Sequence, residues 1–351
     1  MSTLQSDAAV VLGRFRGPHL GHIQLIEEAL ARADKVIIGV GSSFQARNSR
    51  NPFVFDEVRE MLNLAFSEAE RQRLRYVPLR DFYDDERWKA ETIRAIEAAA
   101  GTTDLQLVGC FKDASSASVS EFPWKLHAVT PRWPDLHATT VRQVLLGGEG
   151  PESVGAVLAP YVHPAIIGYL KAWMRTPACA AMVAETRAVQ AYRQKYGAGP
   201  FVSTDAAVFC QDKLLVIQRG GVIGHGLLAL PGGFLEADEE LLAGALRELR
   251  EETRFPLPDW TMRRALRGVR SFSHATRSQR ARIITFAHHF ELGDIEEPQV
   301  QAADDALHSN GRNSARFVSE QEMHDREAEW FEDHFVMAQA FFDARRAFQA
   351  G

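Results

Sequence analysis

Residues 232–255 read GGFLEADEELLAGALRELREETRF, a pair of glycines that suits a tight turn followed by a run with helical spacing. On a helix Glu248, Glu251 and Glu252 stand at i, i+3 and i+4, so their carboxylates share one face. Leucines at helical spacing mark another face that a core can bury. Clustered acids repel by about 0.2–0.5 kcal/mol per pair, and a hard cation such as Mg²⁺ would convert that cost into binding. The alternative is a solvated helix with salt bridges, which charge alone favours.

The fixed register of this stretch resembles the Nudix box, G-x5-E-x7-R-E-U-x-E-E-x-G-U, in which U is aliphatic or aromatic. Every fixed position matches except the last glycine, which is Arg254 here. An arginine in the left-handed turn that this glycine normally makes costs about 1 kcal/mol or more, so the departure concerns the helix end and not the carboxylates. The resemblance implies that Glu251 and Glu252 bind metal, and that Glu248 is a ligand or the base that activates water. It further implies that Arg247 orients the glutamates, and that the metal is Mg²⁺, with Mn²⁺ as the alternative.

The length and composition limit the class of protein. A chain of 351 residues exceeds the size of one ordinary core and predicts two domains. The net charge of −6 argues against a nucleic-acid-binding surface, although a local basic pocket for nucleotides is compatible with it. The three cysteines are widely spaced and form no CxxC pair, which indicates reduced thiols in a cytoplasmic protein and no zinc site. No segment approaches the ~20 apolar residues of a membrane span, so we expect neither export nor membrane insertion.

Strands and helices alternate over the first half of the chain. This alternation predicts a parallel sheet with helices on both faces, in which ligands bind at the carboxyl ends of the strands. The expected strands are 8–12, 35–40, 74–78 and 104–108, and the expected helices are 22–32, 55–66, 87–100, 140–146 and 163–174.

The pattern changes after a helical connector at 176–200. Strands at 201–210 and 213–219 flank Gln211-Asp212 as a hairpin, strands follow near 264–272 and 283–292, and a final helix is expected at 327–348. Mixed strands with few helices predict an α+β domain. The predicted fold class is therefore α/β, with a Rossmann-like parallel-sheet domain at 1–175 and a C-terminal α+β Nudix domain at 201–351.

The sequence GRFRGPHLGH, residues 13–22, follows the first strand directly and opens the first helix. Glycines there let the backbone approach a phosphate, and the helix N-terminus adds partial positive charge. His19 and His22 stand one turn apart and can donate to phosphate oxygens on the same side. A pair of histidines is more often structural, but its position at a strand-to-helix turn favours binding.

This segment resembles the nucleotidyltransferase superfamily, whose mark is H-x-G-H after the first strand. It is most similar to the archaeal-type nicotinamide mononucleotide adenylyltransferases, whose usual opening is G-R-F-x-P-x-H-x-G-H, with Gly17 here in place of the proline. The resemblance implies an adenylyltransferase domain at 1–175, in which Gly13, Arg14 and Phe15 bind substrate. It also implies that the two histidines contact the phosphates of ATP.

A second superfamily motif is matched weakly by HATTVR, residues 137–142. Ala138 replaces its serine, and we take Thr140 and Arg142 as its threonine and arginine. A threonine that caps a helix whose next turn carries arginine suits triphosphate binding. The resemblance therefore implies that Thr139 and Thr140 bind substrate and that Arg142 contacts the triphosphate.

Three shorter segments strengthen this resemblance. They are Arg47 before residues 51–53 (NPF), residues 81–83 (DFY) before Trp88, and residues 109–116 (GCFKDASS), which include Lys112 and Asp113. By resemblance Arg47 contacts phosphate, the Trp88 segment holds the nicotinamide ring, and Lys112 with Asp113 binds substrate. The alternatives are a core aromatic for Trp88 and a surface lysine for Lys112.

The resemblance implies two reactions. In the first, the 5′-phosphate of nicotinamide mononucleotide attacks the α-phosphorus of ATP, which gives NAD and pyrophosphate by positioning and charge neutralisation. In the second, a Mg²⁺-dependent Nudix site hydrolyses ADP-ribose to AMP and ribose 5-phosphate. The segment RSQRAR, residues 277–282, resembles R-S-x-R-G-R of ADP-ribose-cleaving relatives and implies that Arg277 and Arg282 bind substrate. A solvated basic run is the alternative.

Other functions are compatible with the same motifs. The Nudix half could be a nucleotide-binding sensor or could cleave another nucleoside diphosphate derivative. The first half could use another phosphate acceptor, such as phosphopantetheine. The expected partners are ATP, nicotinamide mononucleotide, NAD and ADP-ribose, without nucleic acid or membrane, and a homo-oligomer stays open.

Overall fold

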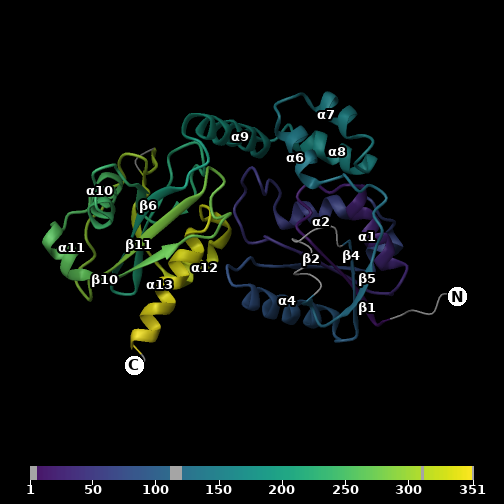
Figure 1. Ribbon diagram of the computed structural model, residues 1–351, viewed down its shortest axis with the longest axis horizontal. Helices are drawn as coiled ribbons and strands as arrows, with labels where there is room; N and C mark the ends of the chain where they lie inside the picture. The colour runs from purple at the N-terminus through teal and green to yellow at the C-terminus, as the bar shows by residue number, and fades with distance from the viewer. Residues whose placement is uncertain (1–5, 111–120, 310–311, 350–351) are drawn as a thin grey trace. The chain divides into compact units, whose positions relative to one another are not determined.

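The computed structural model describes residues 6–110, 121–309 and 312–349 (Figure 1). Contacts divide the chain into two compact units, Met1–Val183 and Ala184–Gly351. The division falls inside helix α9 (Pro177–Tyr196), which fills most of the expected connector. None of the helices among the described residues has the length and apolar composition that crossing a membrane requires.

Unit 1 contains a five-stranded sheet in the order β3-β2-β1-β4-β5, with every pairing parallel. The strands are β1 (Ala8–Gly13), β2 (Val36–Val40), β3 (Leu74–Pro78), β4 (Leu105–Gly109) and β5 (Lys125–Ala128). The helices are α1 (Leu20–Leu30), α2 (Phe55–Asn63), α3 (Glu68–Arg71), α4 (Asp85–Ala100), α6 (Ala138–Leu146), α7 (Pro151–Leu158) and α8 (Pro164–Trp173). Strand order reverses between β1 and β4, and such a reversal opens a crevice at the carboxyl ends of the strands. The predicted Rossmann-like α/β class is confirmed.

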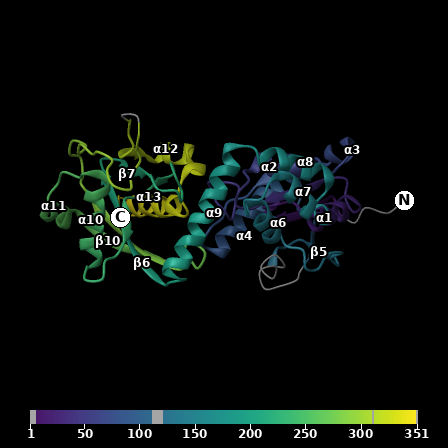
Figure 2. The same cartoon turned by 90° about the horizontal axis from the view of Figure 1, so that it is seen from above.

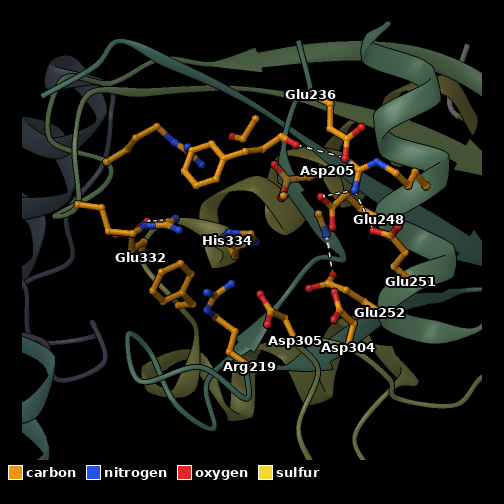
Figure 3. Close-up of a pocket in the computed structure, with 18 residues that line it drawn as sticks. Asp205, Arg219, Glu236, Glu248, Glu251, Glu252, Asp304, Asp305, Glu332 and His334 are labelled. Atoms are coloured by element: carbon orange, nitrogen blue, oxygen red, sulfur yellow. Dashed lines mark hydrogen bonds and ion pairs between the residues drawn. The ribbon is translucent and has the colours of Figure 1, made fainter. Parts of the chain in front are cut away.

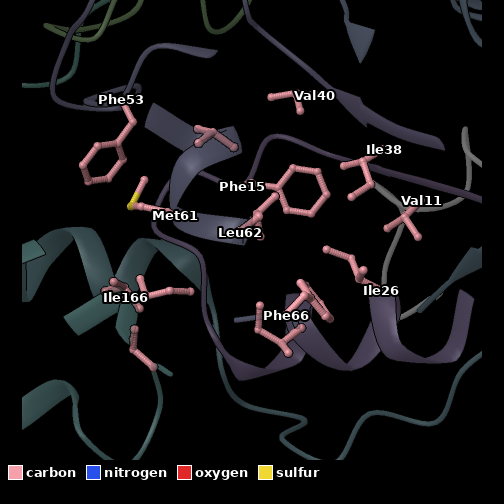
Figure 4. Close-up of a cluster of buried hydrophobic side chains, with 14 of the residues drawn as sticks. Val11, Phe15, Ile26, Ile38, Val40, Phe53, Met61, Leu62, Phe66 and Ile166 are labelled. Carbon is pink, nitrogen blue, oxygen red and sulfur yellow. The ribbon is translucent and has the colours of Figure 1, made fainter. Parts of the chain in front are cut away.

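The core of unit 1 explains why its strands read as continuous apolar runs. Alternate residues of β1 belong to different clusters, with Ala9 and Val11 on one side of the sheet and Ala8 and Val10 on the other. Figure 4 shows the first cluster, in which residues of α1, α2 and α8 cover the sheet. Residues of α4 cover the opposite face. A strand that is buried on both faces has no polar side, so its sequence does not alternate.

Unit 2 contains a mixed sheet in the order β10-β11-β6-β7-β14, in which β6 and β11 are parallel. Its strands include β6 (Phe201–Cys210), β7 (Lys213–Gln218), β8 (Leu228–Ala229), β9 (Gly232–Phe234), β10 (Leu266–Phe272), β11 (Ile283–Glu291) and β14 (Arg316–Ser319), beside the small pair β12 (His308–Ser309) and β13 (Arg312–Asn313). Its helices are α10 (Leu241–Thr253), α11 (Asp259–Ala265), α12 (Glu320–Asp325) and α13 (His334–Gln349). The β6–β7 pairing makes the expected hairpin, with Gln211 at a positive φ of 53° in its turn.

Helices cover both faces of the sheet in unit 2 (Figures 1 and 2). Apolar residues of α13 pack with alternate residues of β6 and β7 in one cluster, and those of α10 and α11 pack in the other. The expected final helix at 327–348 is wrong at its start. A single 3₁₀ turn occupies Glu327–Glu329, the chain then leaves helical geometry, and α13 begins only at His334. Glu332 in the interruption has a positive φ of 45°.

Candidate active sites

The loop between β1 and α1 places two histidines in a fixed arrangement. His19 caps α1, and its Nδ1 accepts the backbone N–H of Gly21 at 3.2 Å. The backbone N–H of His19 in turn donates to Nδ1 of His22 at 3.3 Å, and the two rings stack with centroids 3.8 Å apart. Burial, followed by the charge of His19, lowers the pKa of His22 well below its ordinary value. Because both Nδ1 atoms accept, a neutral ring carries its proton on Nε2, where it can donate to a phosphate oxygen.

Arginines gather around the same loop. Arg142 of α6 donates from Nη1 to the backbone oxygen of Arg16 at 3.2 Å and from Nη2 to Thr139 Oγ1 at 3.1 Å. Burial, then the charges of Arg14 and Arg50, lowers the pKa of Arg142. Burial and then Arg14 lower the pKa of Arg16 to about 9, and its buried Nε has no hydrogen-bond partner within the described part of the chain. This excess of positive charge at the end of β1 fits a polyanion such as a triphosphate.

Two predicted residues of unit 1 are engaged elsewhere. Arg47 forms an ion pair with Glu57, with Nη2 2.8 Å from Oε1, and donates from Nη1 to the backbone oxygen of Pro52 at 2.8 Å. A phosphate would have to compete with that carboxylate. Trp88 is half-buried and packs edge-to-face on Phe122 with centroids 5.6 Å apart, which matches the core-aromatic alternative.

The other predicted residues of unit 1 lie in different surroundings. Gly13 faces the ring of Phe15, which a Cβ at Gly13 would approach to 3.0 Å. Phe15 adopts a positive φ of 48° and is buried. Thr140 lies exposed in the first turn of α6. Lys112 and Asp113 lie outside the described residues.

The glycine turn and α10 of unit 2 fit together closely (Figure 3). A Cβ at Gly233 would overlap the carboxylate of Glu248, so any other residue there would displace that side chain. The backbone N–H of Gly232 donates to Oε2 of Glu252 at 2.9 Å. The helix ends at Arg254, which takes the left-handed conformation at φ 47° and donates its N–H to the oxygen of Arg250 at 2.8 Å. The helix end therefore keeps the geometry of the motif without its glycine.

The three glutamates of α10 line one cavity but do not converge on one point. Arg247 donates from Nη1 to Glu248 Oε1 at 2.9 Å and to Glu251 Oε2 at 2.8 Å, and it also forms an ion pair with Glu239. Within the described residues no three Asp, Glu, His or Cys side chains are placed to hold a metal ion in this arrangement. In this arrangement Arg247 is the cation that contacts Glu248 and Glu251, whereas Glu252 accepts the backbone N–H of Gly232.

The chemistry of this donor set nevertheless fits a divalent metal. Glu252 is 2% exposed, and burial raises its pKa to about 8; burial also raises the pKa of Glu248. Asp205 of β6 is buried beside Gly232, with a pKa that burial raises to about 6. Asp304 and Asp305 line the same cavity. Buried carboxylates are costly unless a cation compensates them, and carboxylate oxygens are what Mg²⁺ and Mn²⁺ prefer.

The opposite wall of the cavity, which measures about 340 Å³, is cationic and aromatic. The guanidinium carbon of Arg219 lies 4.2 Å from the ring centroid of Phe331, and that of Arg280 lies 5.4 Å from the same centroid and 5.5 Å from that of Phe234. Burial and then the charge of Arg280 lower the pKa of Arg219. We call Arg219, Arg280, Phe234 and Phe331 the cationic wall. Such stacked guanidinium planes suit phosphate oxygens or an aromatic base.

Of the two arginines predicted for this site, only one reaches the cavity. Arg277 lines it but forms a buried bidentate pair with Asp333, at 2.8 Å from Nε to Oδ2 and 2.7 Å from Nη2 to Oδ1. Arg282 does not line this cavity and donates to the backbone oxygen of Ser273 at 2.6 Å. Arg280, between them in sequence, contributes to the cationic wall.

Sequence reasoning missed several residues of the cavity. Two of them could have been found from the sequence: Arg280 belongs to the RSQRAR segment, and Asp205 is an acidic residue inside an apolar strand. Arg219, Phe331 and His334 lie in no motif, and no local pattern in the sequence distinguishes them.

Comparisons with known protein families agree with this geometry. Residues 10–144 match the Cytidylyltransferase-like family, and residues 200–339 match the NUDIX domain family. These matches define the class of the chain as a nucleotidyltransferase joined to a Nudix domain.

Individual relatives specify the family. The chain is 32% identical over 149 residues to a nicotinamide/nicotinic acid mononucleotide adenylyltransferase of Acinetobacter baylyi, a match that covers 42% of this chain and 79% of that protein. It is 27% identical over 162 residues to a nicotinamide-nucleotide adenylyltransferase of Archaeoglobus fulgidus, with coverage of 43% and 89%.

A solved structure matches both units. It is the bifunctional NMN adenylyltransferase/ADP ribose pyrophosphatase of Francisella tularensis in complex with AMP and a Mn ion, with a TM-score of 0.84 and 28% identity over 97% of this chain and 99% of that one. The chain belongs to the nicotinamide mononucleotide adenylyltransferase family, and a NUDIX domain follows its adenylyltransferase part.

Proposed function

We propose that this chain makes NAD from nicotinamide mononucleotide and ATP in unit 1, and hydrolyses ADP-ribose to AMP and ribose 5-phosphate in unit 2. One observation carries the proposal: each motif set folds into its own site, with arginines and stacked histidines in one unit and buried carboxylates in the other. The first activity is assigned to residues 1–175 and the second to residues 201–351. A reducing, cytoplasmic setting is part of the proposal, and three unpaired cysteines support it.

The residues of unit 1 act by position and charge. His19 and His22 offer Nε2–H donors, and Arg142 with its neighbours offers guanidinium groups to the triphosphate of ATP. The attacking 5′-phosphate is ionised at neutral pH, so no side chain has to remove a proton from it. The arginine charges stabilise the negative charge that accumulates on the departing pyrophosphate.

The residues of unit 2 bind the substrate at two ends. Glu248, Glu251 and Glu252 would hold Mg²⁺ or Mn²⁺, which when bound polarises the diphosphate and lowers the pKa of the attacking water. To do so, Glu248 and Glu251 exchange their contacts with Arg247, while Gly232 keeps Glu252 in place. The cationic wall holds the part of the substrate that lies away from the glutamates.

The test uses the full chain and two variants. Wild-type protein with ATP, nicotinamide mononucleotide and Mg²⁺ should yield NAD, and with ADP-ribose and Mg²⁺ or Mn²⁺ it should yield AMP, both measured by chromatography. Arg142→Ala should abolish only the first product and Glu252→Gln only the second, because the sites share no residues. Loss of both products in either variant, or absence of both in the wild type, would reject the assignment.

A further inference from the structure

His334 is the first residue of α13 and lines the cavity of unit 2. The interruption before α13 brings it there: the chain turns at Phe331, whose backbone oxygen accepts the N–H of His334 at 3.0 Å. In Figure 3 the ring is drawn between Glu332 and Arg219 on one side and the glutamates of α10 on the other. The side chain is 8% exposed, so it faces the cavity and not the outer surface.

The backbone contact of His334 determines its tautomer. The N–H of Leu230 donates to Nδ1 at 3.1 Å, and a backbone N–H can only donate, so Nδ1 carries a lone pair and no proton. An imidazolium would place two donors face to face and is excluded by this contact. The ring is therefore neutral and carries its proton on Nε2. Among the residues that the structure describes, the contact from Leu230 to Nδ1 is the one hydrogen bond of this ring.

The charges around the ring indicate which kind of group would accept a hydrogen bond from Nε2. The guanidinium groups of Arg277, Arg219 and Arg280 all act on His334 and, after burial, keep its pKa well below its ordinary value. Arg277 is paired with Asp333 and Arg280 with Glu332, so among the described residues Arg219 is the cation near the ring that is left to attract an anionic oxygen. A neutral N–H can donate to that oxygen without adding positive charge. The acceptor class with the right charge is a diphosphate oxygen of a nucleoside diphosphate substrate.

We propose that His334 is a substrate-binding residue that donates its Nε2–H to a diphosphate oxygen of the substrate hydrolysed in unit 2. The proposal rests on the ADP-ribose hydrolysis assigned above. The ring then makes two separate hydrogen bonds. Nδ1 accepts the N–H of Leu230, which fixes the ring, and Nε2 donates to the substrate.

Two isosteric substitutions separate these contacts. In His334→Asn the amide oxygen takes the place of Nδ1 and keeps the Leu230 contact, but the side chain is too short to donate into the cavity. In His334→Gln the amide nitrogen takes the place of Nε2, and the Leu230 N–H loses its acceptor. Both full-length variants are assayed with ADP-ribose and Mn²⁺ or Mg²⁺, and their NAD synthesis in unit 1 serves as the internal control.

The expected results are opposite for the two variants. His334→Asn should lower kcat/KM for ADP-ribose by about 10- to 100-fold, the range for a hydrogen bond to a charged acceptor, with a thermal midpoint within about 2 °C of the wild type. His334→Gln should keep kcat/KM within about fivefold but lower the midpoint by about 2–4 °C, because it leaves a buried N–H unsatisfied.

The outcomes distinguish this inference from the proposed function. If wild-type protein releases no AMP from ADP-ribose, the proposed function fails before His334 is considered. If the wild type is active and His334→Asn stays within twofold of it, the proposed donor role is overturned. A loss of activity in His334→Gln alone, in step with its lower midpoint, also overturns it and leaves the ring with a purely structural role.

Discussion

In metal-free protein, Glu252→Gln should remove a pH dependence from the unfolding free energy of unit 2. Burial raises the pKa of Glu252 from 4.5 to about 8, so between these values the folded state holds a proton that the unfolded state has lost. The free energy of unfolding therefore falls as pH rises through this window, by about 1.4 kcal/mol per pH unit and at most about 5 kcal/mol in total. Below pH 4.5 and above pH 8 this group contributes no slope. Glutamine is neutral throughout and has no such window.

The assay is urea unfolding of full-length protein in EDTA at pH 5, 6, 7 and 8. Groups that do not interact with Glu252 also titrate in this range, and their contribution cancels in the difference between wild type and variant. Glu251→Gln is the matched control, since its side chain is 46% exposed on the same helix, and it should keep the wild-type slope. Addition of Mn²⁺ at pH 8 should stabilise the wild type more than Glu252→Gln, because metal binding needs the ionised carboxylate. An unchanged slope in Glu252→Gln would refute the burial argument.

Three further substitutions test contacts in both units. Arg142→Lys keeps the charge but loses the forked contacts, so kcat/KM for NAD synthesis should fall by about 10- to 100-fold while AMP release stays unchanged in the same preparation. Arg277→Met leaves Asp333 buried and unpaired and should lower the free energy of unfolding by about 3–5 kcal/mol in urea titration, with partial recovery in the double variant that adds Asp333→Leu. Gly233→Ala should reduce ADP-ribose hydrolysis at least about tenfold by displacing a glutamate, whereas Gly221→Ala, with open space around its Cβ, should not.

The sequence predicts those parts of both units that local patterns determine. The apolar run Val36–Val40 has no polar side because both faces of its sheet are covered, and the alternation of such runs with helices was enough to predict the parallel sheet. The spacing of Glu248, Glu251 and Glu252 placed three acids on one helix, and the structure places them along one cavity. The apolar run and the spacing of the glutamates each span fewer than about ten residues, so the information for each is contained in one short window.

Side-chain partners across long sequence separations were not predictable in this way. Arg47 pairs with Glu57, and Arg277 pairs with Asp333, 56 positions further along the chain. A motif specifies that an arginine stands at a position, but the carboxylate that holds it is chosen by the tertiary fold. Arg247 differs from these two, because its partners Glu248 and Glu251 lie one and four positions along the same helix, where the motif places them.

The position of His334 depends on where α13 begins. Local helix preference and the burial of aromatic side chains before α13 oppose each other there, and helical spacing alone does not determine which is larger. A continuous helix over 327–348 would have placed this residue two turns inside it, whereas in the structure it is the first residue of α13 and lines the cavity. The interruption buries Trp330 and Phe331 to 2% exposure each, and Phe331 N–H donates to Leu228 at 2.9 Å. Local helix preference is worth at most about 0.7 kcal/mol per ordinary residue, whereas full burial of one large apolar side chain contributes about 1.5–3 kcal/mol. Two buried aromatic rings therefore outweigh the helical preference of the few residues in the break, and the helix begins at the cavity.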